Sequence, residues 1–275
     1  KASWDEVFKI IKSKIENTSK DKICGFVGDL TNMETGFIFK EFFERTIDTK
    51  NYESRSSQSF IDNSERENYL FNSSINGIEE TDLILLIGTN PRFEATMVNA
   101  RIRKAYLNNN VKIISLNDVG DLTYPYKSLD GKTQTIKDII ENKNDISKNI
   151  LDSEKPMIIL GESFLNNKSA KYLFHSLKAF LVANNKFTDD WNPLNILSVD
   201  AAKVGSLDLD IINQNDNLIK ELYNNKYELV YLLGQDNLNF NKKNEFIIYQ
   251  GSHGDKGAEI ADIILPGAAY TEQSG

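Results

Sequence analysis

The chain has 275 residues, of which 40% are hydrophobic and 26% charged, values typical of a globular protein with one large domain or two ordinary ones. Its net charge of −8 argues against nucleic acid or an anionic membrane surface as the main partner. The single cysteine, Cys24, excludes a disulfide framework and a cysteine-based zinc or iron–sulfur site in these residues, and no apolar run approaches the ~18 residues of a membrane span. We therefore expect a soluble, intracellular protein.

The first half of the chain alternates between helix and strand patterns. Ser3 with Glu6, and Thr31 with Glu34, form capping-box patterns that predict two helices. The continuous apolar run from Leu83 to Ile87 is typical of a strand buried on both faces. The remaining predictions are strands at 23–27 and 111–116, a polar loop at 46–66, a helix starting at 90–91 and a short helix at 135–142.

The second half repeats this alternation after a charged stretch at 143–155, which we interpret as a linker. Strands are predicted at 157–160, 194–199, 227–233 and 246–249, helices at 170–182 and 217–223, and a short apolar segment at 261–265. Repeated strand–helix–strand units favour parallel sheets with right-handed crossovers. The sequence therefore predicts an α/β protein with two parallel-sheet Rossmann-like units, at residues 1–150 and 151–275, the second truncated at its C-terminus.

Two turns at predicted strand ends are candidate anion sites. Gly88-Thr89-Asn90-Pro91 joins a buried strand to a helix start, where free N–H groups can hold a phosphate. The second turn, residues 251–257, begins with Gly251-Ser252-His253-Gly254 and could hold an anion with its backbone N–H groups. The first turn lacks a G-x-G-x-x-G fingerprint, and a glycine-rich turn with a surface histidine, such as the second, needs no ligand. Simple strand-to-helix turns are therefore the favoured interpretation of both.

Other reactive residues have simpler explanations. Cys24 lies inside an apolar strand, which favours a buried, inert thiol, and His175 lies at the solvent edge of a helix. Two distant histidines without partner cysteines do not make a metal site. The basic cluster of Arg101, Arg103 and Lys104 indicates a solvated helix face or a subunit contact. We assign no catalytic residue and no metal ligand in this chain.

Several segments together resemble the large iron–sulfur subunit of NADH-quinone oxidoreductase, which is the 75 kDa or G-chain subunit of respiratory complex I. The segments are GIEETDLILLIGTNPRFEA at 77–95, VNARIRK at 98–104, YQGSHGDKGA at 249–258 and IADIILPGAAYTE at 260–272. The start, Ser3-Trp4-Asp5-Glu6, is similar to the beginning of the molybdopterin-oxidoreductase-like domain in this family. The resemblance covers nearly the whole chain.

The resemblance implies a fragment of a protein that takes part in electron transfer from NADH to quinone in the respiratory chain. Iron–sulfur clusters are then expected in a cysteine-rich N-terminal region that is absent here, and no cofactor is expected in this fragment. The domain would be a non-catalytic scaffold in the peripheral arm, with other subunits as partners and with neither nucleic acid nor direct membrane insertion. The implied location is the cytoplasmic side of a bacterial inner membrane or the matrix side of the mitochondrial one.

Two alternatives remain open at this point. In an active oxidoreductase domain that binds a molybdopterin dinucleotide, Ser56, Ser57 or Ser59 would ligate the metal, while Gly88 and Asn90 would contact the pterin nucleotide. A bare nucleotide-binding module is the other. For the scaffold, we expect the Arg101–Lys104 helix to contact a neighbouring subunit, so that replacing Arg101 and Lys104 by Glu weakens assembly.

Overall fold

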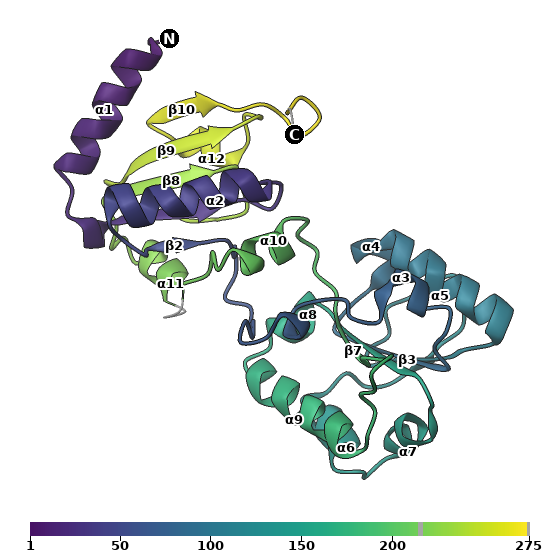
Figure 1. Ribbon diagram of the computed structural model, residues 1–275. Helices are drawn as coiled ribbons and strands as arrows, with labels where there is room; N and C mark the ends of the chain where they lie inside the picture. Colours follow the sequence, from purple (N-terminus) through teal and green to yellow (C-terminus); the bar gives the residue numbers. More distant parts are fainter. Residues whose placement is uncertain (214–216, 274–275) are drawn as a thin grey trace. The chain divides into compact units, whose positions relative to one another are not determined.

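The computed structural model describes residues 1–213 and 217–273, which fall into two compact units. Unit 1 comprises Lys1–Gln58 and Asp200–Gly275, and unit 2 comprises Ser59–Val199. Each unit holds one five-stranded sheet whose recorded strand pairs are all parallel (Figure 1). The predicted α/β class with two parallel-sheet units is confirmed.

The division of the chain differs from the predicted boundary near residue 150. The chain leaves unit 1 after residue 58, builds unit 2 completely, and returns to place Leu229 beside Ile23 in a parallel pair. The segment interpreted as a linker contains a helix, capped by the Asn144 side chain, whose Ile146 and Ile150 are buried at i, i+4 spacing. Local patterns do not encode which distant strand a segment will pair with, so the interruption of unit 1 could not be seen in them.

In unit 1 the sheet has the order β10-β9-β8-β1-β2. Its strands are β1 (Ile23–Val27), β2 (Tyr52–Glu53), β8 (Leu229–Leu233), β9 (Phe246–Gly251) and β10 (Ile263–Pro266). Its helices are α1 (Trp4–Glu16), α2 (Met33–Glu41), α10 (Lys203–Asp208), α11 (Leu218–Tyr223) and α12 (Lys256–Ile260), with a 3-10 turn, η1 (Lys20–Lys22), and a π-helical turn, η2 (Phe42–Ile47), that continues α2. Residues of α2 and η2 pack on one face of this sheet, and residues of α11 pack on the other.

The two predicted capping boxes of unit 1 have different outcomes. Ser3 and Glu6 form the complete box at the start of α1, as predicted. At α2 the cap is Asn32, whose side chain accepts from the Thr35 N–H at 2.8 Å, so the Thr31 box is wrong. The extended backbone of Asn32 allows its short amide side chain to reach the helix first turn, one residue later than the pattern indicated.

In unit 2 the sheet has the order β5-β4-β3-β6-β7. Its strands are β3 (Leu83–Ile87), β4 (Lys112–Ser115), β5 (Lys127–Ser128), β6 (Pro156–Leu160) and β7 (Leu194–Ile196). Its helices are α3 (Ser74–Gly77), α4 (Pro91–Glu94), α5 (Thr96–Asn109), α6 (Thr133–Ile140), α7 (Asp145–Asp152), α8 (Glu162–Leu165) and α9 (Ala170–Ala183), with a 3-10 turn, η3 (Arg66–Asn68).

The sheet of unit 2 is covered on both faces, with α5 on one and with α6, α7 and α9 on the other (Figure 1). This double covering explains why β3 and β6 are buried along their whole length. Among the described residues, no helix combines the length and the apolar composition that crossing a membrane requires.

Candidate functional site

Each sheet has one place where its strand order reverses, beside the first strand of its unit. In unit 1 this switch point lies between β1 and β8, and in unit 2 it lies between β3 and β6. Open parallel sheets bind ligands in the crevice beyond the carboxyl ends of the strands at such a point, where dinucleotides place their pyrophosphate. The two switch points are therefore the candidate binding positions of this fold.

The switch point of unit 2 is filled by the protein itself. Gly88 has a φ of +64°, and a Cβ atom on it would lie 2.3 Å from the backbone nitrogen of Phe164. The Gly88 carbonyl accepts from the Ser163 N–H at 3.1 Å, and the Gly161 N–H donates to Ile87. The turn after β6 thus lies directly against the turn after β3.

The polar groups of the predicted Gly88–Pro91 turn are bonded to protein atoms. The Asn90 amide oxygen accepts from the Arg92 N–H at 3.2 Å, and its nitrogen donates to the Val119 carbonyl at 2.9 Å. The Thr89 hydroxyl donates to Glu94 at 2.6 Å. Asn90 is thus the helix cap with Pro91 in the first turn, in agreement with the favoured strand-to-helix interpretation. Cofactor contact by Gly88 and Asn90 stays a prediction.

The switch point of unit 1 is open. A cavity of about 340 Å³ lies at the ends of β1, β8, β9 and β10. The residues that line it are Asp29, Leu30, Thr31, Asn32, Thr35, Leu233, Gly234, Asp236, Asn237, Tyr249, Gln250, Gly251, Ser252, His253, Asp255, Gly267, Ala268, Tyr270 and Gln273. Three of these residues are aspartates, and the described lining contains neither lysine nor arginine. Such a lining is unfavourable for a pyrophosphate, because negative charge faces negative charge.

The glycine-rich turn at 251–257 already binds an internal anion. The carboxylate of Asp236 accepts from the Gly257 N–H at 2.8 Å and from the Tyr249 hydroxyl at 2.9 Å. Burial, reinforced by the Asp236 carboxylate, raises the pKa of Tyr249 well above its ordinary value. Ser252 and His253 bond each other at 2.8 Å on the exposed side of the turn. The sequence indicated a possible anion-binding turn at 251–257, but not that the Asp236 carboxylate bonds to it, because Asp236 follows a different strand, β8.

The serine-rich segment at 54–59, the serine loop, follows β2 and is anchored by a buried ion pair. Glu53 and Arg55 are 1% and 4% exposed, and the two side chains meet at 2.6 Å. Glu53 also accepts from the Asn213 N–H at 3.1 Å. Of the three candidate metal ligands, Ser56 and Ser57 are half-buried in unit 1, and Ser59 is buried in unit 2. Their role as ligands stays a prediction.

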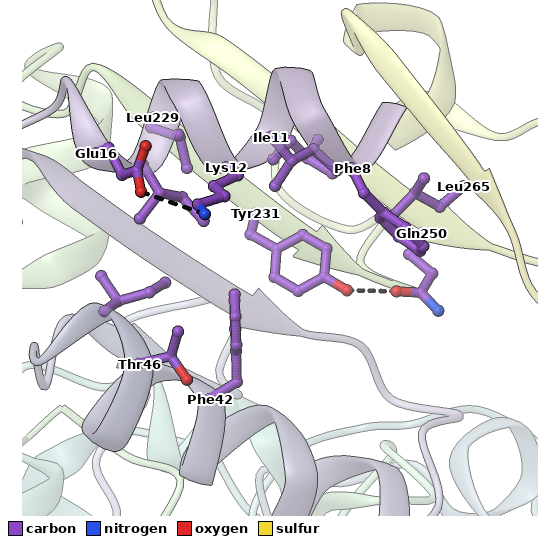
Figure 2. Close-up of a pocket in the computed structure, with 13 residues that line it drawn as sticks. Phe8, Ile11, Lys12, Glu16, Phe42, Thr46, Leu229, Tyr231, Gln250 and Leu265 are labelled. Atoms are coloured by element: carbon purple, nitrogen blue, oxygen red, sulfur yellow. Dashed lines mark hydrogen bonds and ion pairs between the residues drawn. The ribbon is translucent and has the colours of Figure 1, made fainter. Parts of the chain in front are cut away.

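An apolar groove lies elsewhere in unit 1, between α1, η2 and the sheet (Figure 2). Its volume is about 490 Å³, and its lining includes Phe8 and Ile11 from α1 together with Leu229 and Tyr231 from β8. The Tyr231 hydroxyl donates to the Gln250 side chain on the sheet side of the groove. The groove was not predicted from the sequence, since it depends on how α1 lies against the sheet and η2.

Cys24 and His175, the other reactive residues considered from the sequence, lie in unit 1 and unit 2, respectively. Cys24 is fully buried, and burial raises the pKa of its thiol well above the ordinary value, as expected for an inert cysteine. His175 is exposed and lies 3.8 Å from Asp62. No group of acidic, histidine or cysteine side chains suited to a metal ion occurs among residues 1–213 and 217–273.

Comparison with known proteins places these features in a family. The model of the molybdopterin oxidoreductase family matches residues 1–275. The chain is 36% identical to the NADH-ubiquinone oxidoreductase 75 kDa subunit of Reclinomonas americana over 288 aligned residues, which cover 99% of this chain and 42% of that protein. It is 36% identical to the G-type NADH-quinone oxidoreductase subunit of Rickettsia bellii, covering 100% of this chain and 39% of that one.

A third relative is the mitochondrial NADH dehydrogenase [ubiquinone] iron-sulfur protein 1 of Solanum tuberosum, 32% identical over 99% of this chain and 36% of that protein. The chain therefore spans between 36% and 42% of the length of these relatives. Two parallel sheets and a family match over every residue agree with each other, and the chain belongs to the molybdopterin oxidoreductase family.

Proposed function

We propose that this chain is a scaffold domain of an NADH-quinone oxidoreductase subunit of the 75 kDa (or G) type and that it holds no molybdopterin. The whole protein takes part in electron transfer from NADH to quinone, and its iron–sulfur clusters lie outside these residues. The domain packs among other subunits of the peripheral arm, on the cytoplasmic side of a bacterial inner membrane or the matrix side of the mitochondrial one. It contacts no nucleic acid and does not enter the membrane.

The observation that carries this proposal is the state of the two switch points. In unit 2 the backbone of Phe164 occupies the space beside Gly88. In unit 1 the open crevice is lined by Asp29, Asp236 and Asp255. A molybdopterin dinucleotide brings a pyrophosphate, which requires free N–H groups or cationic side chains. The described residues at these two places do not fit that group.

Family membership supports the alternative of an active molybdopterin-dependent oxidoreductase domain. Under that alternative Ser56, Ser57 or Ser59 would supply the oxygen ligand of the metal, and Gly88 and Asn90 would contact the pterin nucleotide. The two proposals differ in what the purified full-length protein contains, so they can be separated by composition alone.

The test is to measure molybdenum and tungsten, together with pterin fluorescence after oxidation, in the full-length subunit purified from its native source. We expect iron in the amounts that the clusters require, with neither molybdenum, tungsten nor pterin. A known molybdopterin enzyme purified in parallel controls for loss of the cofactor. One metal and one pterin per chain would overturn the scaffold proposal.

Replacing all three serines by alanine adds a second readout. We expect the Ser56→Ala, Ser57→Ala, Ser59→Ala protein to assemble and to support NADH-dependent quinone reduction at the rate of the parent. If one of these hydroxyls holds a metal in a working site, the triple variant loses both the metal and the activity that depends on it.

A further inference from the structure

Helices α4 and α5 of unit 2 expose large apolar side chains. Phe93, Met97 and Leu107 are 80%, 73% and 67% exposed. On α5 the buried residues Val98 and Ile102 point toward the sheet. Ten residues at 100° each place Met97 and Leu107 only ~80° apart around the helix axis, so they share one face. That face lies more than ~100° away from the direction of Val98 and Ile102. Met97 and Leu107 are separated by about 15 Å along the axis.

Small and cationic side chains lie between these apolar residues. Ala100, which is exposed, falls between Met97 and Leu107 on the same face and leaves room for another backbone to approach. Arg103 lies at the side of this face, is exposed, and has no ion-pair partner among the described residues. The sequence of α5 contains three basic residues and no acidic one, in a chain with a net charge of −8.

The basic cluster is divided by Glu79. Lys104 meets Glu79 at 2.7 Å, and Arg101 donates to the same carboxylate. These two bonds hold the pKa of Glu79 below its ordinary value. Arg101 and Lys104 are thus engaged within unit 2, whereas Arg103 is available. Replacing Arg101 and Lys104 by Glu would break internal ion pairs, so it tests the predicted contact less cleanly than a change at Arg103.

We propose that this face, comprising Phe93, Met97, Ala100, Arg103 and Leu107, is the docking surface for an acidic amphipathic helix of another subunit. The inference rests on the proposed function, which supplies the partner subunits. Along α5 the exposed residues Met97, Ala100, Lys104 and Leu107 follow at spacings of three and four, so they form one stripe in which Lys104 is bound to Glu79 and the other three are apolar. Such a stripe can pack against the apolar stripe of a second helix. The unpaired Arg103 selects a partner that brings a carboxylate to its rim.

The test is site-specific photocrosslinking in the full-length subunit within its assembled complex. A photoreactive amino acid replaces Ala100, and the matched control replaces Ala179, an exposed alanine on α9 of the same unit. We expect position 100 to crosslink to a peptide of another subunit with apolar residues at helical spacing and a neighbouring acidic residue. Position 179 should give a clearly lower yield of intersubunit product.

Charge reversal gives an independent measure. Arg103→Glu should lower the ratio of assembled complex to free subunit on native gels, with a loss in affinity of about tenfold. Lys171→Glu, an exposed lysine on α9, should leave this ratio unchanged.

The outcomes separate the inference from the proposal on which it rests. A full-length protein that copurifies with the complex but forms no intersubunit crosslink at position 100, or crosslinks there only to lipid or nucleic acid, overturns the docking surface alone. A full-length protein that does not copurify with other complex subunits overturns both.

Discussion

The switch points of the two units differ in what lies beside their strand ends. In unit 2 the turn after β3 and the turn after β6 are in contact, so there is no room beside Gly88. In unit 1 a Cβ atom on Gly28 would lie 1.7 Å from the Gly234 carbonyl oxygen, yet a cavity of about 340 Å³ remains beyond this contact. The first crevice is filled, and the second is open but acidic.

This difference teaches that a shared topology does not determine what its crevice can bind. Parallel strands bring their carboxyl ends to one edge in both units, and this much follows from the strand order. Whether the edge accepts an anion depends on a few side chains in the turns. In unit 1 these include Asp236, whose carboxylate takes the N–H of Gly257 that a phosphate would otherwise use.

The largest expected effect concerns the buried ion pair of unit 1. Arg55→Met should lower the free energy of unfolding by about 3–5 kcal/mol, because it leaves the buried carboxylate of Glu53 without its counter-charge. Hydrogen exchange can compare the two units, since the amides of β1 and β8 should lose protection while those of β3 and β6 change less.

The matched control for this change removes both charges. The double variant Glu53→Leu, Arg55→Met should recover a large part of the lost stability, because no buried charge is then left unpaired. A loss below about 1 kcal/mol in Arg55→Met would mean that the pair behaves as an exposed one and does not anchor the serine loop.

An intermediate effect is expected where β1 meets β8. Gly28→Ala should cost about 3 kcal/mol, the upper end for overpacking, because the new Cβ meets a backbone carbonyl rather than a flexible side chain. Gly254→Ala is the control, since a Cβ there meets nothing within 4 Å, and neither glycine has a positive φ. We expect the control to stay within about 0.5 kcal/mol of the parent in urea unfolding. Equal effects at both positions would show that the strand ends can separate freely.

Much of the fold could be predicted from local sequence, because the information lies in local patterns. The apolar run from Leu83 to Ile87 predicted a buried strand, and Ser3 with Glu6 predicted the start of α1; both are confirmed. Helix α7 was missed because charged residues mask the pair of Ile146 and Ile150. The interruption of unit 1 by unit 2 was missed because it depends on pairing between distant strands.

The site was less predictable than the fold. The sequence located the strand-end turns, and the structure brings several of them to one edge in unit 1. It could not indicate that the backbone of Phe164 fills the space beside Gly88 at the carboxyl end of β3. Nor could it indicate that Glu79 pairs with two of the three basic residues on α5. These features arise from close contacts between segments that are separate in the chain.

The smallest expected effect is a pH dependence in unit 2. Asp82, before β3, has a pKa below the ordinary 3.8, since burial raises it but is outweighed by hydrogen bonds from the Ser153 hydroxyl and from the N–H groups of Glu154 and Lys155. A depressed pKa contributes stability that is present above pH 3.8 and is lost as the pH falls through the folded-state value. Asp82→Asn should therefore be less stable than the parent at neutral pH. The loss in unfolding free energy should be about 1 kcal/mol or less, because Asp82 is exposed. The loss should shrink below pH 3.8.

The measurement can be confined to unit 2, because Trp191 is buried there with its indole N–H donating to the Pro156 carbonyl at 2.9 Å. Replacing the other tryptophan, Trp4→Phe, leaves Trp191 fluorescence as a probe of this unit alone. Ser153→Ala removes one of the donors and should reproduce part of the loss at neutral pH. If the difference in unfolding free energy between Asp82→Asn and the parent is constant from pH 7 to pH 3, these hydrogen bonds do not favour the ionised carboxylate. The start of β3 is then held by packing alone.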